Sequence, residues 1–226
     1  MPRAPVAERC NGLDDDCDGQ VDNDLHCPIW TAAVGPADAQ FVGTVTEVTK
    51  SQYASCVAAG ACVAPASSHQ ALSECNWQLP DRLDHPINCV NWEESRSYCQ
   101  WLGGDLPSEE EWEAVAGGRA LVQPWGNTPA DCTKAHSGGC APRGTVPVLT
   151  LFLGGVSPSG AYDMIGNLRE WTRTMDEESP LLKGGGFDDN IVGEMVNISW
   201  RLRLPSERRS VDLGIRCIKP APPPNP

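Results

Sequence analysis

The stretch that decides the fold is HPINCVNWEESRSYCQWLGGDLPSEEEWEAVAGG, residues 85–118. Its first part, residues 91–102, has apolar residues that cluster toward its end and stops at Gly103-Gly104, which predicts a helix. Ser108 can cap a second helix, because the acidic residues 109–111 that follow it suit the positive end of a helix dipole. Two short helices joined by a glycine turn are therefore expected here.

Outside this stretch, regular structure is sparse. A third helix is predicted from Lys50 to Ala59 with Thr49 as its cap, and short strands are predicted at Ser199–Leu204 and Leu213–Ile218. The remaining chain is rich in Gly, Pro and Asn, as is typical of long loops. A chain with so much irregular structure needs disulfides or metal sites to hold it together.

The 226-residue chain is long enough for one main core and a small appendage. We expect an acidic module at residues 1–28, a main domain at 29–219 and a proline-rich tail at 220–226. The eight tryptophans are expected to anchor the core or its edges. The net charge of −13 argues against nucleic acid and anionic membranes as partners, and no apolar run is long enough for a transmembrane segment.

Eleven scattered cysteines favour a disulfide framework made outside the cytoplasm. We therefore expect a secreted, periplasmic or cell-surface protein whose signal or lipoprotein sequence has been removed, although the N-terminal residues themselves contain no targeting core.

CNGLDDDCDGQVDND, residues 10–24, has the alternating carboxylates and glycine of a calcium-binding loop. Leu25 stands where an EF-hand would place its bidentate glutamate, so modest affinity is expected. The pattern also resembles thrombospondin type 3 repeats and a short metal-binding motif of secreted bacterial proteins. A disulfide between Cys10 and Cys17 would close the loop, and the alternative is a solvated acidic tail. The predicted ligands are Asp14, Asp16, Asp18, Asp22 and Asp24.

Several motifs of the main domain occur together and in order. They are EVTKSQYASC (47–56), the stretch 85–118 quoted above, PWGN (124–127), SGAYDMIGNLREWT (159–172), LLKGGGF (181–187) and LGIRC (213–217). From about Val42 to Cys217, the chain resembles the formylglycine-generating enzyme, or sulfatase-modifying factor, family. The resemblance implies an α+β, variant C-type lectin-like fold that is loop-rich and disulfide-stapled, with small antiparallel sheets and two or three helices.

The resemblance also implies a structural calcium site in DMIGNLREW. Its ligands would be the carboxylates of Asp163 and Glu170 and the carbonyls of Gly166 and Leu168. The alternative is a tight turn in which glycine and asparagine only satisfy the backbone geometry.

For the cysteines, the resemblance implies that Cys99 pairs with Cys217. Short loops would be closed by Cys56–Cys62 and Cys132–Cys140, and Cys75–Cys89 is a fourth expected pair. With Cys10–Cys17 as the fifth, Cys27 is left as a free thiol or as a link to another chain.

Enzymes of this family use a copper-bound cysteine pair close to a glycine-rich motif. In KGGGFDDNIVGEMVNISWRLR, residues 183–203, the matching positions fall at or next to Asp189 and Glu194, so no copper is expected because copper(I) prefers thiolates. These two carboxylates could bind a harder ion or act as acid and base, but structural carboxylates are favoured. The arginines expected to balance them are Arg201, Arg203, Arg208, Arg209 and Arg216, and the candidate binding groove comprises Asp188, Asp189, Glu194, Trp200 and Arg201.

Two functions remain open at this point. The first is a secreted, calcium-stabilised, non-catalytic module that binds a protein, peptide or glycan through its lectin-like groove. The second is a metal- or cofactor-dependent oxidoreductase of the wider family that works without the cysteine pair.

Overall fold

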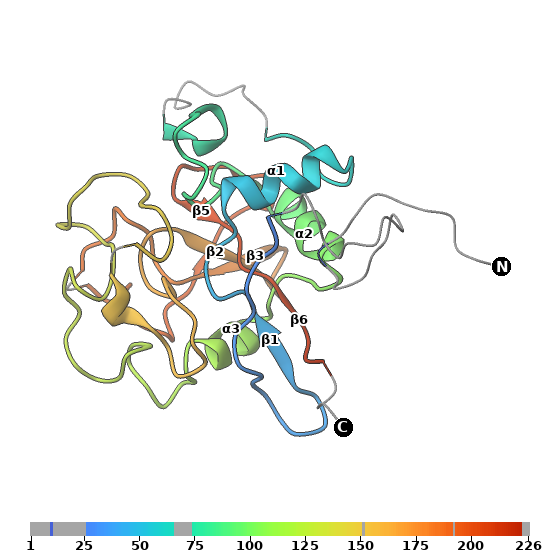
Figure 1. The fold of residues 1–226 in the computed structure, drawn as a ribbon. Coiled ribbons are helices and arrows are strands. Elements are labelled where there is room, and N and C mark those ends of the chain that lie inside the picture. Colours follow the sequence, from blue (N-terminus) through green and yellow to red (C-terminus); the bar gives the residue numbers. More distant parts are fainter. Residues whose placement is uncertain (1–9, 11–25, 66–73, 151, 192, 223–226) are drawn as a thin grey trace.

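The computed structural model describes residues 10, 26–65, 74–150, 152–191 and 193–222 (Figure 1). It is an α+β, loop-rich fold with three α-helices among the described residues. The helices are α1 (Lys50–Ala58), α2 (Trp92–Trp101) and α3 (Glu109–Val115). All three predicted helices are confirmed, and their N-caps Thr49, Asn91 and Ser108 each complete a capping box with the residue three positions later.

The strands form two small sheets in the described part of the chain. The larger has the order β4 (Leu202–Arg203), β3 (Ser179–Lys183), β2 (Arg169–Asp176) and β5 (Leu213–Gly214); the smaller pairs β1 (Phe41–Gly43) with β6 (Ile218–Pro220). Two 3₁₀ turns, Asn76–Gln78 and Leu153–Gly155, lie in the connections. As Figure 1 shows, the two sheets and three helices are joined by long loops.

One detail of the predicted sheets is wrong. Strands β2 and β5 pair in parallel, with Arg169 opposite Leu213, so the larger sheet is mixed and not purely antiparallel. The physical reason is the connection, because the long excursion between β3 and β5 lets β5 return in the same direction as β2.

The smaller sheet joins the two ends of the main domain. Strand β1 pairs antiparallel with β6, and the Ala221 amide donates to the Gln40 carbonyl at 3.0 Å. Ordered pairing thus extends just past Pro220, where the proline-rich tail was predicted to begin. The three-part division of the chain stays a prediction.

The core is built on buried tryptophans, as the sequence indicated. Trp171 packs with α1 and α2 side chains in one cluster, and Trp112 packs with Met164 and Ile165 in a second. The side chains of Trp112 and Trp171 are fully buried. Both clusters adjoin the loop that starts β2, so the core fixes the position of that loop.

Five disulfides join described cysteines. Four of them are the expected pairs Cys56–Cys62, Cys75–Cys89, Cys99–Cys217 and Cys132–Cys140. The fifth joins Cys10 to Cys27, so the predicted Cys10–Cys17 pair is wrong and Cys27 is not left over. Cys17 is nearer to Cys10 in the sequence, which is why that pair was predicted. The fold instead brings the Cα atoms of Cys10 and Cys27 to 5.4 Å, a normal disulfide separation.

Within the described ranges, no helix is long and apolar enough to cross a membrane.

Candidate functional site

The predicted calcium motif forms a tight loop directly before β2. Asp163, Gly166 and Asn167 have φ angles of 55°, 85° and 56°, which lie in the left-handed region. Gly166 is required for a second reason, because a Cβ atom there would lie 2.3 Å from the His136 carbonyl oxygen. Backbone conformation and close packing therefore both fix this loop.

Glu47, in the EVT motif, holds the loop from the side. Its carboxylate is fully buried, and it accepts hydrogen bonds from the Leu168 amide at 2.8 Å and the Asn167 side-chain amide at 2.6 Å. The Asn167 side-chain carbonyl in turn accepts from the Val146 amide at 3.0 Å. Four segments that are distant in sequence, around residues 47, 136, 146 and 167, are thereby joined.

Glu170 and Arg216 form a fully buried ion pair beside this loop. Arg216 Nε lies 3.0 Å from both carboxylate oxygens, and Trp112 Nε1 donates to Oε2 at 2.5 Å. The other guanidinium nitrogens of Arg216 donate to the carbonyls of Thr44 and Tyr162 at 2.6 and 2.8 Å. Arg216, which was expected to balance Asp189 and Glu194, is thus the partner of Glu170.

The carboxylates of Glu47, Asp163 and Glu170 all lie around Arg216, so this part of the structure has more acidic than basic groups. Burial raises the pKa of Asp163 to about 6, with Arg216 opposing and Glu170 adding to the rise. Burial, then the charges of Asp163 and Glu170, raise the pKa of Glu47 well above its usual value. The charged forms of Asp163 and Glu47 are therefore disfavoured here, and a further positive charge would favour them.

A hard cation with oxygen ligands fits this surplus of acid. The structure places the four predicted calcium ligands, Asp163, Gly166, Leu168 and Glu170, within one loop and the start of β2. Glu170 Oε2 accepts from Arg216 and Trp112, and Oε1 lies within 3.0 Å of two Arg216 nitrogens, so calcium bound by Glu170 would replace one of these contacts. Among the described residues, no three or more His, Cys, Asp or Glu side chains are grouped to hold a metal, so carbonyl oxygens would have to complete this site.

The glycine-rich segment after β3 lies against the same loop. The Gly166 amide donates to the Gly184 carbonyl at 3.0 Å, and the Phe187 amide donates to the Asn167 carbonyl at 2.9 Å. Gly184 and Gly185 have φ angles of 94° and 70°, which glycine adopts without strain. The loop at 163–168 and the loop at 184–189 therefore form one hydrogen-bonded unit.

Asp189 is bound inside this unit. Its side chain is 7% exposed, pairs with the Arg169 guanidinium and accepts from the Gly186 amide at 2.7 Å. Its carbonyl accepts from the Ser137 hydroxyl and the Gly138 amide. The carboxylate is thus held by a cation and a backbone donor.

The cation that balances Asp189 was missed in the sequence. It is Arg169, 13% exposed, and it contacts Asp212 as well. Arg169 directly precedes Glu170 on β2, and neighbouring residues on a strand point to opposite faces. This alternation could have indicated from the sequence that Arg169 and Glu170 face different partners, Asp189 and Arg216.

The other residues of the predicted groove differ in environment. Asp188 and Glu194 are exposed, and Trp200 is half-buried. Arg201 is largely exposed and lies 3.2 Å from Glu109 on α3. Of this set, Asp189 is the buried member, and the set stays a prediction as a binding surface.

A second buried charge network was also missed. Lys183, at the start of the glycine-rich motif, is fully buried and lies 2.8 Å from Glu113 and 3.3 Å from Glu109. Its ammonium also lies 5.5 Å from the centre of the Trp112 ring. This network ties β3 to α3, next to the loop at 184–189.

The acidic N-terminal module cannot be placed in this geometry. Its predicted ligands lie outside the described residues, as does Cys17; the ligands are Asp14, Asp16, Asp18, Asp22 and Asp24.

Comparisons with known proteins agree with this geometry. Inactive C-alpha-formylglycine-generating enzyme 2 of Bos taurus is 32% identical over 161 residues, covering 63% of this chain and 53% of that protein. Formylglycine-generating enzyme of Bos taurus is 31% identical over 154 residues, covering 58% and 39%. The chain thus spans about half the length, or less, of these curated relatives.

Among solved structures, PvdO from Pseudomonas aeruginosa superposes with a TM-score of 0.64 and 19% identity, covering 86% of this chain and 93% of that one. This likeness supports the fold. The model of the sulfatase-modifying factor enzyme 1-like domain matches residues 36–221, which is most of the chain. The protein therefore belongs to the formylglycine-generating enzyme-like, or sulfatase-modifying factor, family.

Proposed function

We propose that this protein is a non-catalytic member of its family, a calcium-stabilised binding module that works outside the cytoplasm. The binding partner would be a protein, peptide or glycan. Five disulfides between described cysteines support an oxidising compartment. One of the matching relatives is named as an inactive enzyme, which supports the absence of catalysis.

The observation that carries the proposal is the environment of Asp189. By resemblance, one cysteine of the copper-binding pair falls at or next to this position, and the Asp189 side chain is engaged by Arg169 and by the Gly186 amide. A carboxylate in a buried ion pair is a poor ligand for copper(I), which selects thiolates. Glu194, at the second matching position, is exposed.

Calcium is proposed as the structural ion of the loop at 163–170. The support is the surplus of buried acid around Arg216 and the glycine-dependent loop that carries the four ligands. When bound, the ion would offset the charge of Asp163 and Glu170. Because this loop is hydrogen-bonded to the loop at 184–189, the ion would stabilise both.

The calcium proposal is tested by thermal unfolding and by counting bound calcium. We expect calcium, but not magnesium at equal concentration, to raise the melting temperature. Asp163→Asn should remove one bound calcium per chain and most of the stabilisation, whereas Asp38→Asn, at an exposed carboxylate, should change neither. Equal stabilisation of the Asp163→Asn variant would refute this site.

The metal-dependent form of the oxidoreductase alternative needs a redox metal with side-chain ligands. Among the described residues no such group of side chains is present, and Asp189 is already engaged. Elemental analysis of the purified protein separates the two functions. Calcium without stoichiometric copper or iron supports a binding module, and stoichiometric copper or iron would contradict it.

A further inference from the structure

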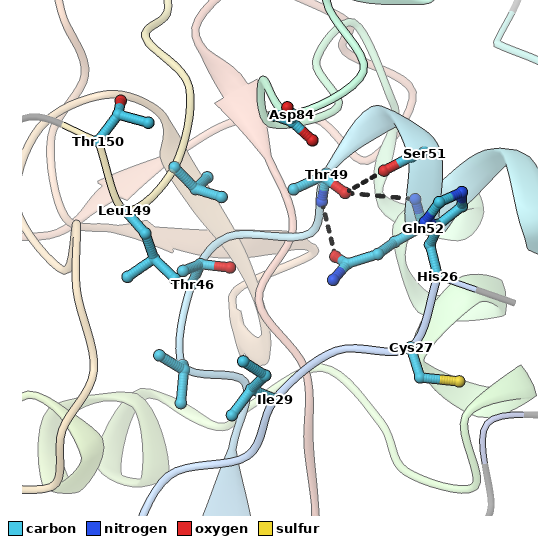
Figure 2. Close-up of a pocket in the computed structure, with 12 residues that line it drawn as sticks. His26, Cys27, Ile29, Thr46, Thr49, Ser51, Gln52, Asp84, Leu149 and Thr150 are labelled. Carbon is cyan, nitrogen blue, oxygen red and sulfur yellow. Dashed lines mark hydrogen bonds between the residues drawn. The ribbon is translucent and has the colours of Figure 1, made fainter. Parts of the chain in front are cut away.

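A pocket of about 350 Å³ lies away from the loops at 163–170 and 184–201. It is formed by the segment before β1, the residues that lead into α1, Asp84 and the loop at 148–150 (Figure 2). Its volume is within the range of sites that hold a small ligand or one large side chain. None of its described lining residues belongs to the loops at 163–170 and 184–201, although Thr49, Ser51 and Gln52 lie in the EVTKSQYASC motif.

One part of the pocket is apolar and unusually exposed. Ile29 is 66% exposed and Leu149 is 41% exposed, and Val45 and Val148 also line the pocket. Clustered, exposed branched side chains of this kind are typical of a surface that is covered by a partner.

The polar part of the pocket lies at the N-terminus of α1, yet it does not suit an anion. The Lys50 amide donates to the His85 carbonyl at 2.9 Å, and the Ser51 amide donates to the Leu83 carbonyl at 3.1 Å. The Gln52 amide donates to the Thr49 hydroxyl at 3.3 Å. The first amides of the helix are thus already used, and an anion would find no free backbone donor.

Oxygen acceptors remain at this end instead. The carboxylate of Asp84 is exposed and lies near Thr49 and Ser51, at the opposite end of the pocket from Ile29 (Figure 2). The hydroxyls of Thr49 and Ser51 lie 3.0 Å apart, and each can also accept a hydrogen bond. Among the described lining residues there is neither a lysine nor an arginine, so they supply no permanently charged cation.

We propose that this pocket binds a lysine or arginine side chain of a partner polypeptide. The alkyl stem would lie on Ile29 and Leu149, and the cation would meet the carboxylate of Asp84 and the hydroxyl of Ser51. A long side chain with an apolar stem and a charged end matches both parts of the pocket. The net charge of −13 also favours the approach of a basic partner.

The inference rests on the proposed binding function but not on its calcium site or on the loss of catalysis. Its test uses the calcium-loaded full chain and the peptide acetyl-Gly-Gly-Lys-Gly-Gly-amide, with binding followed by NMR titration. One matched peptide carries norleucine, which keeps the alkyl stem and lacks the ammonium. Another carries glutamate.

We expect the lysine peptide to shift the resonances of the pocket residues and to bind more tightly than the other two peptides. Asp84→Asn should weaken its binding about fivefold, because an exposed ion pair contributes up to about 1 kcal/mol. Ile29→Ser should weaken the lysine and norleucine peptides alike. The control Asp38→Asn, at an exposed carboxylate outside the lining, should change nothing.

Three outcomes would overturn the inference. They are equal affinity for the lysine and norleucine peptides, unchanged lysine binding in Asp84→Asn, and no saturable shift of the pocket residues up to about 10 mM peptide. None of these outcomes affects the test for calcium at Asp163 or the elemental analysis for copper and iron, so failure here is distinguishable from failure of the proposed function.

Discussion

At the scale of single residues, Asp189 has an environment that a sequence position alone does not reveal. A carboxylate beside a glycine-rich motif could be a ligand, a general base or half of an ion pair. Its 7% exposure and its contacts with Arg169 and the Gly186 amide favour the ion pair. Removing one partner of a buried pair leaves the other charge uncompensated, so such a residue matters for stability.

Asp189→Ala is expected to lower the free energy of unfolding by about 1–3 kcal/mol, since Arg169 keeps its contact with Asp212. The physical reason is that Arg169 and the Gly186 amide lose a common acceptor. Urea unfolding monitored by tryptophan fluorescence measures the change. The control is Glu194→Ala, an exposed site where the change should stay within about 0.5 kcal/mol. Similar small effects at both positions would contradict a structural role for Asp189.

Stability is also expected to fall in mild acid because of His85. Burial, then the nearby charge of Arg82, lower the pKa of His85 to about 4 from its usual value of 6.5. As the pH falls below 6.5, the unfolded chain takes up a proton that the folded chain resists. This contribution is therefore fully present above pH 6.5 and is lost as the pH falls towards 4.

Measuring the free energy of unfolding from pH 7 to pH 4.5 tests this expectation. In His85→Asn, the loss of stability with falling pH should be shallower by up to about 1 kcal/mol per pH unit. The same substitution at the exposed His26 is the control and should leave the slope of the parent protein. An unchanged slope in His85→Asn would show that other groups govern the acid response.

At the scale of structural elements, the helices could be predicted and the strand partners could not. Thr49, Asn91 and Ser108 cap their helices through contacts only three residues away, so local sequence was sufficient. The pairing of β3 with β4 and the parallel pairing of β2 with β5 depend on contacts between distant segments. The same is true of Arg169 with Asp189, which lie far apart in sequence and meet only in the fold.

The loop at 163–168 offers a direct test of close packing. Gly166 and Gly160 have φ angles of 85° and 90°, so alanine at either position experiences comparable backbone strain. A Cβ on Gly166 would lie 2.3 Å from the His136 carbonyl oxygen, whereas a Cβ on Gly160 meets nothing within 4 Å. Gly166→Ala is expected to destabilise the protein by at least about 2 kcal/mol more than Gly160→Ala in thermal or urea unfolding. Equal effects would contradict the close packing of this loop on His136.

At the scale of the whole molecule, the disulfides hold together a chain with little regular structure. Cys99–Cys217 spans 118 residues and ties α2 to the end of the domain, whereas Cys56–Cys62 spans six. Replacing both cysteines of the first pair by alanine should cost about 5 kcal/mol, against about 2 kcal/mol for the second pair, on the loop-entropy model. Denaturant unfolding of the two double variants measures both losses of stability. A larger loss for the Cys56–Cys62 pair would contradict this expectation.

The family motifs were sufficient to predict the fold class and the Cys99–Cys217 disulfide, and the short spacing between cysteines predicted three other disulfides. They could not predict the partner of Cys10, because CNGLDDDCDGQVDND contains a nearer cysteine than Cys27 and the choice depends on the fold. They also gave no indication of the pocket at Asp84, since only Thr49, Ser51 and Gln52 of its lining lie in a family motif and most of the other lining residues come from three further segments. Function is harder to predict than fold, because the chemistry of a site depends on which residues that are distant in sequence come into contact.

We propose that the protein lacks the oxidase chemistry of formylglycine-generating enzyme, and an assay of peptide oxidation tests this proposal. The calcium-loaded protein is incubated with copper(I), oxygen and a cysteine-containing peptide, and conversion of the peptide cysteine to an aldehyde is followed by mass spectrometry, with formylglycine-generating enzyme as the positive control. We expect no aldehyde above the protein-free background and no stoichiometric copper on the protein. Turnover of the peptide with copper bound to the chain would contradict it.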